Sequence, residues 1–172
     1  MHIEGARAVN LVGAWVLSVA DAVREAAERS TGMGGAGPAA LVAVAAEPGM
    51  SVETLRRALG LTHPGAVRLV DRLEERGWVE RSPGGGRAVA LRPTAAGVTA
   101  RDALLAARHD AIAAQLERLG PDRERLAAVI EPLLLDQAAD AGELRRLCRL
   151  CDRAACEPCP PWTHLEPDAG DG

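Results

Sequence analysis

The chain has 172 residues and a formal net charge of −4, and its only aromatic residues are three tryptophans. This length fits one domain with an extended dimerising part, and the scarcity of aromatic side chains favours packed helices over a β-sandwich. Residues 51–92 carry eight Arg against five acids, whereas the remainder carries twelve Arg against nineteen acids. A basic module on an acidic chain is typical of proteins that bind nucleic acid.

The sequence argues against both a signal peptide and a membrane-spanning segment. The apolar run at 8–20 imitates the core of a signal peptide, but Glu4 offsets Arg7 where a basic start is needed. No uninterrupted apolar stretch approaches the roughly 18 residues of a membrane span. We therefore expect a soluble, cytoplasmic protein with no membrane partner.

The first element is one long helix, expected over residues 5–30. Five of its valines recur at alternating spacings of three and four residues: Val9, Val12, Val16, Val19 and Val23. This valine stripe requires a partner surface. Residues 31–38 break the helix, and a short apolar helix is expected at 39–46.

A helix, a tight turn and a second helix follow. Ser51 is a suitable N-cap for a helix at 52–59, and Gly60 ends that helix. Thr62 caps the next helix, which Gly77 closes. Four apolar residues of this second helix are expected to face inward: Ala66, Leu69, Val70 and Leu73.

A basic β-hairpin comes next. Two short strands near 78–82 and 87–92 flank a Gly-rich tip at 83–86, which is the size of a wing. Thr94 then caps a long helix at about 95–118.

The last predicted helix spans about 122–141, and Pro132 should kink it. One face of this helix is apolar: Leu126, Ile130, Leu133 and Leu134. The acidic, proline-containing tail at 161–172 is expected to be disordered.

The second helix of the helix-turn-helix is expected to enter the major groove of DNA. Its N-terminal residues reach deepest toward the base edges, and a Gly-rich hairpin tip can approach the adjacent minor groove. The predicted DNA contacts are Thr62, His63, Pro64, Gly65 and Arg68 near the bases, Arg72 near the phosphates, and Arg87 on the wing.

Residues 59–97 resemble the multiple-antibiotic-resistance regulator (MarR) family. The resemblance is carried by LGLTHPGAVRLVDRLEERGWVERSPGGGRAVALRPTAAG, within which RLVDRLEERGWVER is the most specific block. It implies a homodimeric DNA-binding transcription regulator, normally a repressor on a palindromic operator, with a cleft for small aromatic or lipophilic effectors. Trp15 and His109 lie on helices that could line such a cleft. The family wing usually carries an Asp two residues before its Arg, and here Gly85 stands at that position.

The fold class expected is mainly α, a winged helix-turn-helix domain with N- and C-terminal dimerisation helices. The boundaries expected are a dimerisation helix and linker at 1–38, the winged domain at 39–97, dimerisation helices at 98–141, a cysteine-rich motif at 142–160 and the tail at 161–172. The partners expected are double-stranded DNA, a second copy of the chain and a small-molecule effector.

The only four cysteines lie within twelve residues: Cys148, Cys151, Cys156 and Cys159. Two C-x-x-C pairs in one short segment can place four thiolates around a single metal. We expect zinc, with an iron–sulfur cluster as the alternative. If no metal binds, the cysteines would be free thiols or would form reversible disulfides. His164 could replace one ligand.

An enzyme is not expected. A thiol oxidoreductase would need its C-x-x-C at a helix N-terminus within a βαβ unit, and no such pattern is present. Phosphate-binding loops and paired catalytic carboxylates are also missing from the sequence. The alternative function is a redox- or metal-responsive thiol protein, or a dimeric scaffold that has lost sequence-specific DNA binding.

Overall fold

The protein is described here by a computed structural model covering residues 5–83 and 89–156. It is mainly helical with one small antiparallel sheet, which confirms the predicted fold class. The helices are α1 (Ala6–Thr31), α2 (Gly37–Ala46), α3 (Val52–Leu59), α4 (His63–Glu75), α5 (Ala95–Leu116), α6 (Arg123–Asp136) and α7 (Ala141–Leu147). Two 3-10 turns, η1 (Glu117–Asp122) and η2 (Ala154–Cys156), and two strands, β1 (Val79–Pro83) and β2 (Val89–Pro93), complete the described elements.

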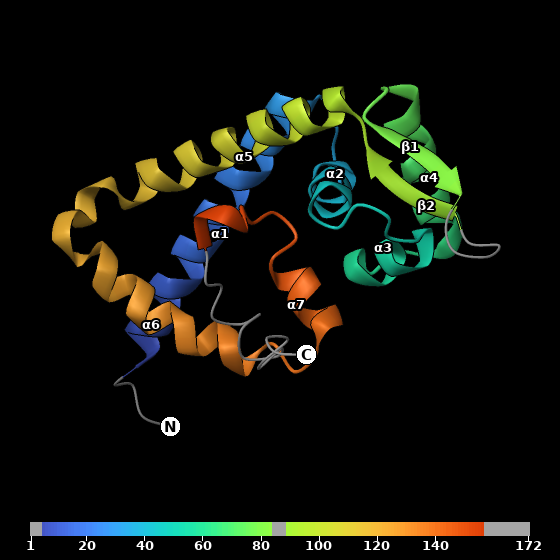
Figure 1. The fold of residues 1–172 in the computed structure, drawn as a ribbon. Coiled ribbons are helices and arrows are strands. Elements are labelled where there is room, and N and C mark those ends of the chain that lie inside the picture. The colour runs from blue at the N-terminus through green and yellow to red at the C-terminus, as the bar shows by residue number, and fades with distance from the viewer. Residues whose placement is uncertain (1–4, 84–88, 157–172) are drawn as a thin grey trace, which may run out of the picture.

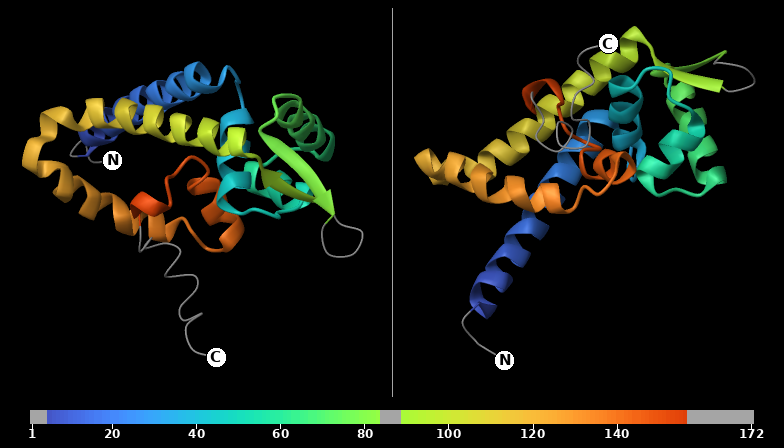
Figure 2. Two further views of the ribbon diagram at one scale, coloured as in Figure 1. Left: turned by 45° about the horizontal axis from the view of Figure 1, so that its top comes forward. Right: turned by 60° about the horizontal axis from the view of Figure 1, so that its bottom comes forward.

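The winged domain lies at one end of the molecule and the long helices extend from it. Figure 1 shows α5 running away from the β1–β2 hairpin and α6 turning back beneath it. α1 packs along α5, and α7 returns to contact α3. The two views of Figure 2 place α7 between the α5–α6 hairpin and the winged domain.

The main core lies inside the winged domain. Its fully buried side chains come from α2, α3, α4 and β2: Leu41, Val44, Leu55, Val70, Leu73 and Leu91. A second cluster joins α1, α2 and α5 through Ala27, Val42, Leu104 and Leu105. Because Val42 belongs to α2, this second cluster ties the winged domain to the long helices.

Most predicted elements occur close to their expected positions, and the side-chain caps account for three of the helix starts. The hydroxyl oxygens of Ser51, Thr62 and Thr94 each accept a hydrogen bond from a backbone N–H three residues on, which begins α3, α4 and α5. All four predicted inward residues of α4 are buried. The hairpin pairs Val79 with Pro93 and Pro83 with Val89.

The predicted helix at 122–141 is too long at its C-terminal end. α6 ends at Asp136, and a separate helix, α7, begins after Asp140. The Asp140 carboxylate accepts hydrogen bonds from the N–H groups of Gly142 at 2.6 Å and Glu143 at 2.9 Å, which is an N-cap that the sequence analysis overlooked. Pro132 lies inside α6, which continues through it.

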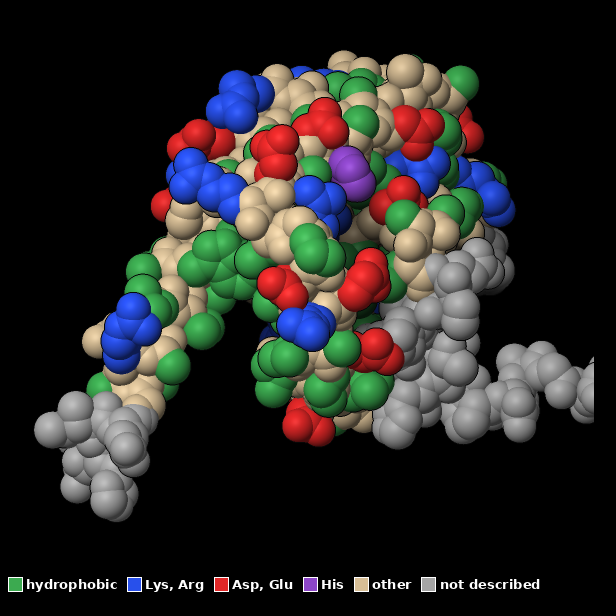
Figure 3. Space-filling model, turned by 90° about the vertical axis from the view of Figure 1, so that its left-hand side faces the viewer, with side chains coloured by type: hydrophobic (Ala, Val, Ile, Leu, Met, Phe, Trp, Pro, Cys, Tyr) green, Lys and Arg blue, Asp and Glu red, His purple; other side chains and the backbone are tan. Residues whose placement is uncertain are grey.

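The valine stripe of α1 is largely uncovered in the single chain. Val9 is 71% exposed, Val12 58% and Val16 50%, whereas Val19 and Val23 are half-buried. Figure 3 shows hydrophobic side chains along this projecting helix. By length and composition alone α1 could cross a membrane, since an 18-residue window has a mean hydropathy of 1.3. A helix that packs against a partner chain passes the same test.

Candidate nucleic-acid interface and cysteine segment

The turn between α3 and α4 is set by Gly60. Its backbone is left-handed, with φ 63°, a conformation that favours glycine. The N–H groups of Gly60 and Leu61 both return to the last turn of α3. This tight reversal holds the start of α4 at the protein surface.

One face of α4 is buried and the opposite face is open to solvent. Arg68 and Arg72 are exposed and form no ion pair within the described parts of the chain, not even with Glu75, which lies three residues after Arg72. A shallow hollow of about 580 Å³ runs along this face, and both arginines line it. Two unpaired guanidinium groups on a projecting helix are suited to contact phosphates or base edges.

The remaining predicted contacts of α4 lie at its beginning. Thr62, His63 and Pro64 are exposed and Gly65 is half-buried, so the structure brings them together with Arg68 at one end of the helix. The wing residue Arg87 and the neighbouring Gly85 lie outside the described residues.

An ion-pair clamp joins the wing to α4, and sequence reasoning missed it. The Arg81 guanidinium on β1 donates to Asp71 at 2.7 Å and also to Glu74. The backbone N–H of Arg81 donates to Glu74 as well, at 3.1 Å. The sequence does contain a signal for this clamp, because Arg81 on the wing follows the acidic residues Asp71 and Glu74 of the preceding helix. The clamp fixes β1 against the helix that is expected to read DNA.

A second set of contacts ties the end of α4 to the long helices. Arg76 donates to the carbonyl oxygens of Thr31 at 2.7 Å and Gly32 at 3.0 Å, and its guanidinium lies 5.0 Å from the centre of the Trp78 ring. At the start of α5, a Cβ added to Gly97 would lie 1.9 Å from the Trp78 carbonyl oxygen. The end of α4 is therefore joined to both α1 and α5 through Trp78 and its neighbours.

The cysteine segment (residues 144–156) lies between the winged domain and α5. Leu144 is fully buried, and Leu150 packs against the second hydrophobic cluster. Arg145 and Arg153 both donate to Glu47 at the end of α2, at 2.9 and 2.8 Å. Burial opposes ionisation of Glu47, but these two arginines prevail and lower the pKa of its carboxyl. The two arginines thus bracket the first two cysteines.

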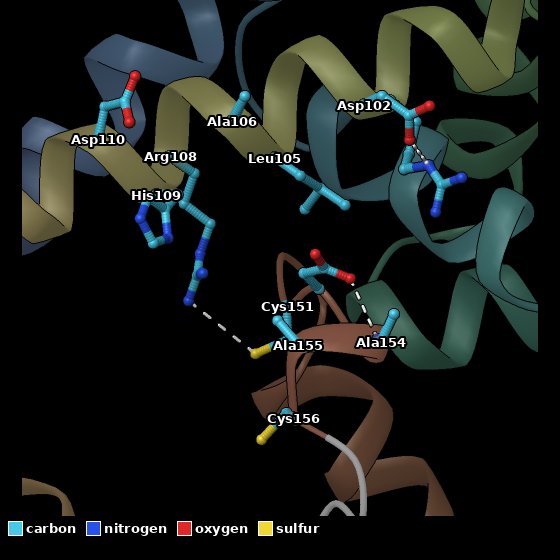
Figure 4. A pocket seen from close by; sticks show the side chains of 12 residues that line it. Asp102, Leu105, Ala106, Arg108, His109, Asp110, Cys151, Ala154, Ala155 and Cys156 are labelled. Carbon is cyan, nitrogen blue, oxygen red and sulfur yellow. Dashed lines mark hydrogen bonds and ion pairs between the residues drawn. The ribbon is translucent and has the colours of Figure 1, made fainter.

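Cys148 and Cys151 form a close pair. Cys148 caps the C-terminus of α7, its carbonyl accepts the N–H of Cys151 at 3.0 Å, and the two side chains are hydrogen-bonded. The hydrogen bond from Cys148, with the charges of Arg108, Arg153 and Arg149, lowers the pKa of Cys151 to about 6 against the effect of burial. Arg108 of α5 points at the Cys151 sulfur, with its nitrogen at 4.0 Å (Figure 4).

The predicted metal centre stays a prediction. Cys156 is exposed on η2, while Cys159 and His164 lie outside the described residues. Among the residues that the structure describes, no three His, Cys, Asp or Glu side chains are gathered as a metal would require.

Two cavities flank the cysteine segment. The larger, of about 720 Å³, lies between α5 and residues 151–156, and Arg108, His109 and Cys151 are among its lining residues (Figure 4). The smaller, of about 390 Å³, lies between α1 and the start of α2, with Arg149 and Leu150 forming one wall. His109 therefore faces the larger cavity, and Trp15 lines neither of them.

A helix-turn-helix with an exposed second helix and an adjoining β-hairpin defines a winged helix-turn-helix DNA-binding regulator. The sequence pattern of the MarR family matches residues 31–88. Residues 31–88 therefore match a MarR-family domain, and the chain has a fold similar to that of MarR-family transcriptional regulators.

Solved structures support the same assignment. A MarR-family transcriptional regulator from Rhodococcus sp. RHA1 is 26% identical, with a TM-score of 0.55 over 71% of this chain and 92% of that one. CouR from Rhodococcus jostii RHA1, bound to p-coumaroyl-CoA, is 26% identical, with a TM-score of 0.60 over 76% of this chain and 91% of that one. The Mycobacterium tuberculosis MarR-family protein Rv2887, in complex with salicylic acid, is 24% identical, with a TM-score of 0.57 over 72% and 93%. None of the curated proteins matches this chain.

Proposed function

We propose that the protein is a homodimeric repressor that binds a palindromic operator through α4 and the wing. The observation that carries this proposal is the open face of α4, where Arg68 and Arg72 project without acidic partners in the described chain. Phosphate contacts would supply affinity, and the first turn of α4 would supply sequence preference. A regulator of this kind acts on DNA in the cytoplasm.

The dimer is supported by two uncovered apolar surfaces. Exposed hydrophobic side chains gather on α1 and α6: Val9, Leu11, Val12, Val16, Leu17, Val129, Leu133 and Leu134. Burying these side chains in a twofold interface would remove them from water and place two copies of α4 on successive half-sites.

Binding of the protein to its own promoter region tests the proposal, measured by fluorescence anisotropy at fixed salt. Arg68→Ala should weaken binding by about 1–3 kcal/mol, because it removes a charged contact in the groove. Arg125→Ala is the control, since this exposed arginine lies on α6. No specific binding by the intact dimer would favour the alternative, a scaffold that has lost DNA recognition.

We also propose that the smaller cavity binds the effector, a small aromatic or lipophilic acid. Its walls are mostly apolar, and Arg149 supplies positive charge, whereas Arg24 is paired with Glu28, which also lines the cavity. CouR bound to p-coumaroyl-CoA and Rv2887 in complex with salicylic acid support this ligand class. Release of operator DNA by salicylate or a coumaroyl thioester, and loss of release in Arg149→Ala, would test the site.

The four cysteines are proposed to bind one metal per chain, zinc in preference to an iron–sulfur cluster. This requires Cys156 and Cys159 to join the Cys148–Cys151 pair, which the fold already holds together. Zinc would fasten the cysteine segment, whereas a cluster would make the segment a redox or iron sensor. Elemental analysis and the visible spectrum of protein purified without oxygen distinguish the two.

A further inference from the structure

We propose that Arg76 is a positioning residue that couples the smaller cavity, between α1 and α2, to α4, the helix proposed to contact DNA. Arg76 is the C-cap of α4, because its backbone N–H returns to the carbonyl oxygens of Arg72 and Glu74. Its side chain reaches the end of a different helix, where it donates to the carbonyl oxygens of Thr31 and Gly32. One residue therefore ends α4 through its backbone and caps α1 through its guanidinium group.

The contact suits the end of a helix. The last carbonyl groups of an α-helix have no partner within the helix, and a cation is favoured beside them. The planar guanidinium group supplies this charge together with two N–H donors, at 2.7 Å from the oxygen of Thr31 and 3.0 Å from that of Gly32. It also lies 5.0 Å from the centre of the Trp78 ring. Two hydrogen bonds from one rigid group fix orientation as well as distance.

The end of α1 is stiffened by Thr31, so a displacement there is passed on. Thr31 is 4% exposed, and its hydroxyl group donates to the carbonyl oxygen of Ala27 at 2.7 Å. The same oxygen accepts the backbone N–H of Met33 at 3.1 Å, and Met33 belongs to the main core. Because these bonds tie the last turn of α1 together, movement of Ala27 also moves the two carbonyl groups that Arg76 holds.

The smaller cavity lies against both sides of this junction. Ala27 and Glu28 line it near the end of α1, and Gly35 lines it from the connection to α2. Gly32 and Gly35 both have left-handed backbones, with φ 61° and 65°, and such glycines let a short connection change direction at low cost. A ligand that moves the cavity walls must change this connection, and Arg76 carries the change to α4. The inference rests on the proposed function, because it takes this cavity as the effector site.

The first test measures the coupling between salicylate and promoter DNA on the full-length protein. In the parent, saturating salicylate should raise the operator Kd at least about fivefold, the lower end of the usual range of coupling. Arg76→Met keeps the aliphatic stem beside Trp78 but loses the charge and both donors. It should bind each ligand alone as the parent does, whereas the effect of salicylate on the operator Kd should fall below about twofold. Calorimetry without DNA measures salicylate affinity, and fluorescence anisotropy measures operator affinity.

Two further variants separate coupling from a general loss of stability. Arg76→Lys keeps the charge but lacks the planar pair of donors, so it should retain an intermediate effect of salicylate. Arg29→Met is the matched control, since Arg29 is an exposed arginine in the last turn of α1 whose ion pair is with Glu25. This control should keep the full effect. Full operator release by salicylate in Arg76→Met, or an equal loss of release in Arg29→Met, would overturn the proposal.

A double-mutant cycle tests the same coupling without DNA or salicylate. Thr31→Val removes the hydroxyl group that stiffens the end of α1, and hydrogen exchange measures the protection of the α4 amides. In the parent, Thr31→Val should lower this protection at least about twofold more than it does in the Arg76→Met background. Equal losses in the two backgrounds, or no loss in either, would overturn the inference. Failure to bind the promoter or to respond to salicylate would refute the proposed function alone, because the cycle uses neither ligand.

Discussion

At the scale of single residues, the absence of a side chain at Gly97 allows the start of α5 to pack closely against the backbone of Trp78, just before β1. A Cβ at this position would lie 1.9 Å from the Trp78 carbonyl oxygen, a backbone atom that cannot rotate away. The same carbonyl accepts the N–H of Thr94 at 3.0 Å, so moving it would also disturb the start of α5. The glycine is therefore required by close backbone approach, not by its dihedral freedom.

Gly97→Ala should lower the free energy of unfolding by about 1–3 kcal/mol, as overpacking a tight contact does. Urea unfolding followed by circular dichroism measures the change. Gly13→Ala is the matched control, because a Cβ there meets no atom within 4 Å in the chain and alanine favours a helix. A Gly97→Ala protein as stable as the parent would show that the α5 junction can shift freely.

Glu47 gives the attachment of the cysteine segment a pH dependence. Its pKa is lowered in the folded protein despite burial, because Arg145 and Arg153 hold the ionised form. A depressed carboxyl pKa contributes stability above the unfolded value, and this contribution is lost as the pH falls through the folded value. The protection factors of the α7 amides in hydrogen exchange, which compare each rate with the intrinsic rate at the same pH, should therefore fall between about pH 5 and pH 3.

Glu47→Gln provides the comparison for this prediction. It should lower the protection of the α7 amides at neutral pH and remove the additional loss of protection at acid pH, because a neutral amide cannot titrate. Glu131→Gln is a control, since this exposed glutamate lies on α6 rather than on α7. An identical pH profile in Glu47→Gln and the parent would contradict the role given to this carboxylate.

At the scale of elements, an ion-pair clamp joins β1 to α4. Arg81 bonds to Asp71 and Glu74, so strand β1 of the wing is held by the helix beside it. Both acids would otherwise present negative charge beside the DNA. Neutralising them and fixing the wing are two effects of the same arginine.

Glu74→Gln separates these two effects. If charge alone mattered, removing a carboxylate near DNA would strengthen binding; because Glu74 also holds the wing, we expect operator affinity to fall, by about 0.5–1 kcal/mol, the worth of a partly exposed ion pair. Anisotropy titrations at two salt concentrations measure it. Glu75→Gln is the control for charge alone, since Glu75 lines the hollow beside Arg68 and Arg72 and forms no ion pair with Arg81. If Glu74→Gln bound the operator more tightly than the parent, the clamp would not be needed to position the wing.

At the scale of the whole molecule, the uncovered apolar faces of α1 and α6 make the single chain incomplete. Deleting residues 1–30 should leave a protein that cannot dimerise, as measured by sedimentation equilibrium, because the valine stripe is removed. Val16→Asp should have the same effect by placing a charge in the apolar interface. Ala96→Asp, at an exposed position in the first turn of α5, should remain dimeric. A truncated protein that stays dimeric would mean that α6 alone carries the interface.

The sequence determined the local structure well, because local rules depend on neighbouring residues. Ser51, Thr62 and Thr94 begin helices through their own hydroxyl groups, Gly60 supplies the left-handed turn, and the apolar spacing of α4 selects its buried face. These features were sufficient to predict the winged helix-turn-helix and the exposed arginines of α4. The helix break at Asp136 was missed, although the Asp140 cap is also local.

Contacts between distant residues were decided only by the tertiary structure. Glu47 meets Arg145 and Arg153 across about a hundred positions of chain, and no spacing rule relates such residues. The cysteine spacing suggested one set of four ligands, whereas the fold pairs Cys148 with Cys151 and turns one of them toward Arg108 on α5. Sequence spacing fixes which sulfurs can meet. The packing of α7 against α3, and of Leu150 against the cluster of α1, α2 and α5, fixes the charge and access that each sulfur receives.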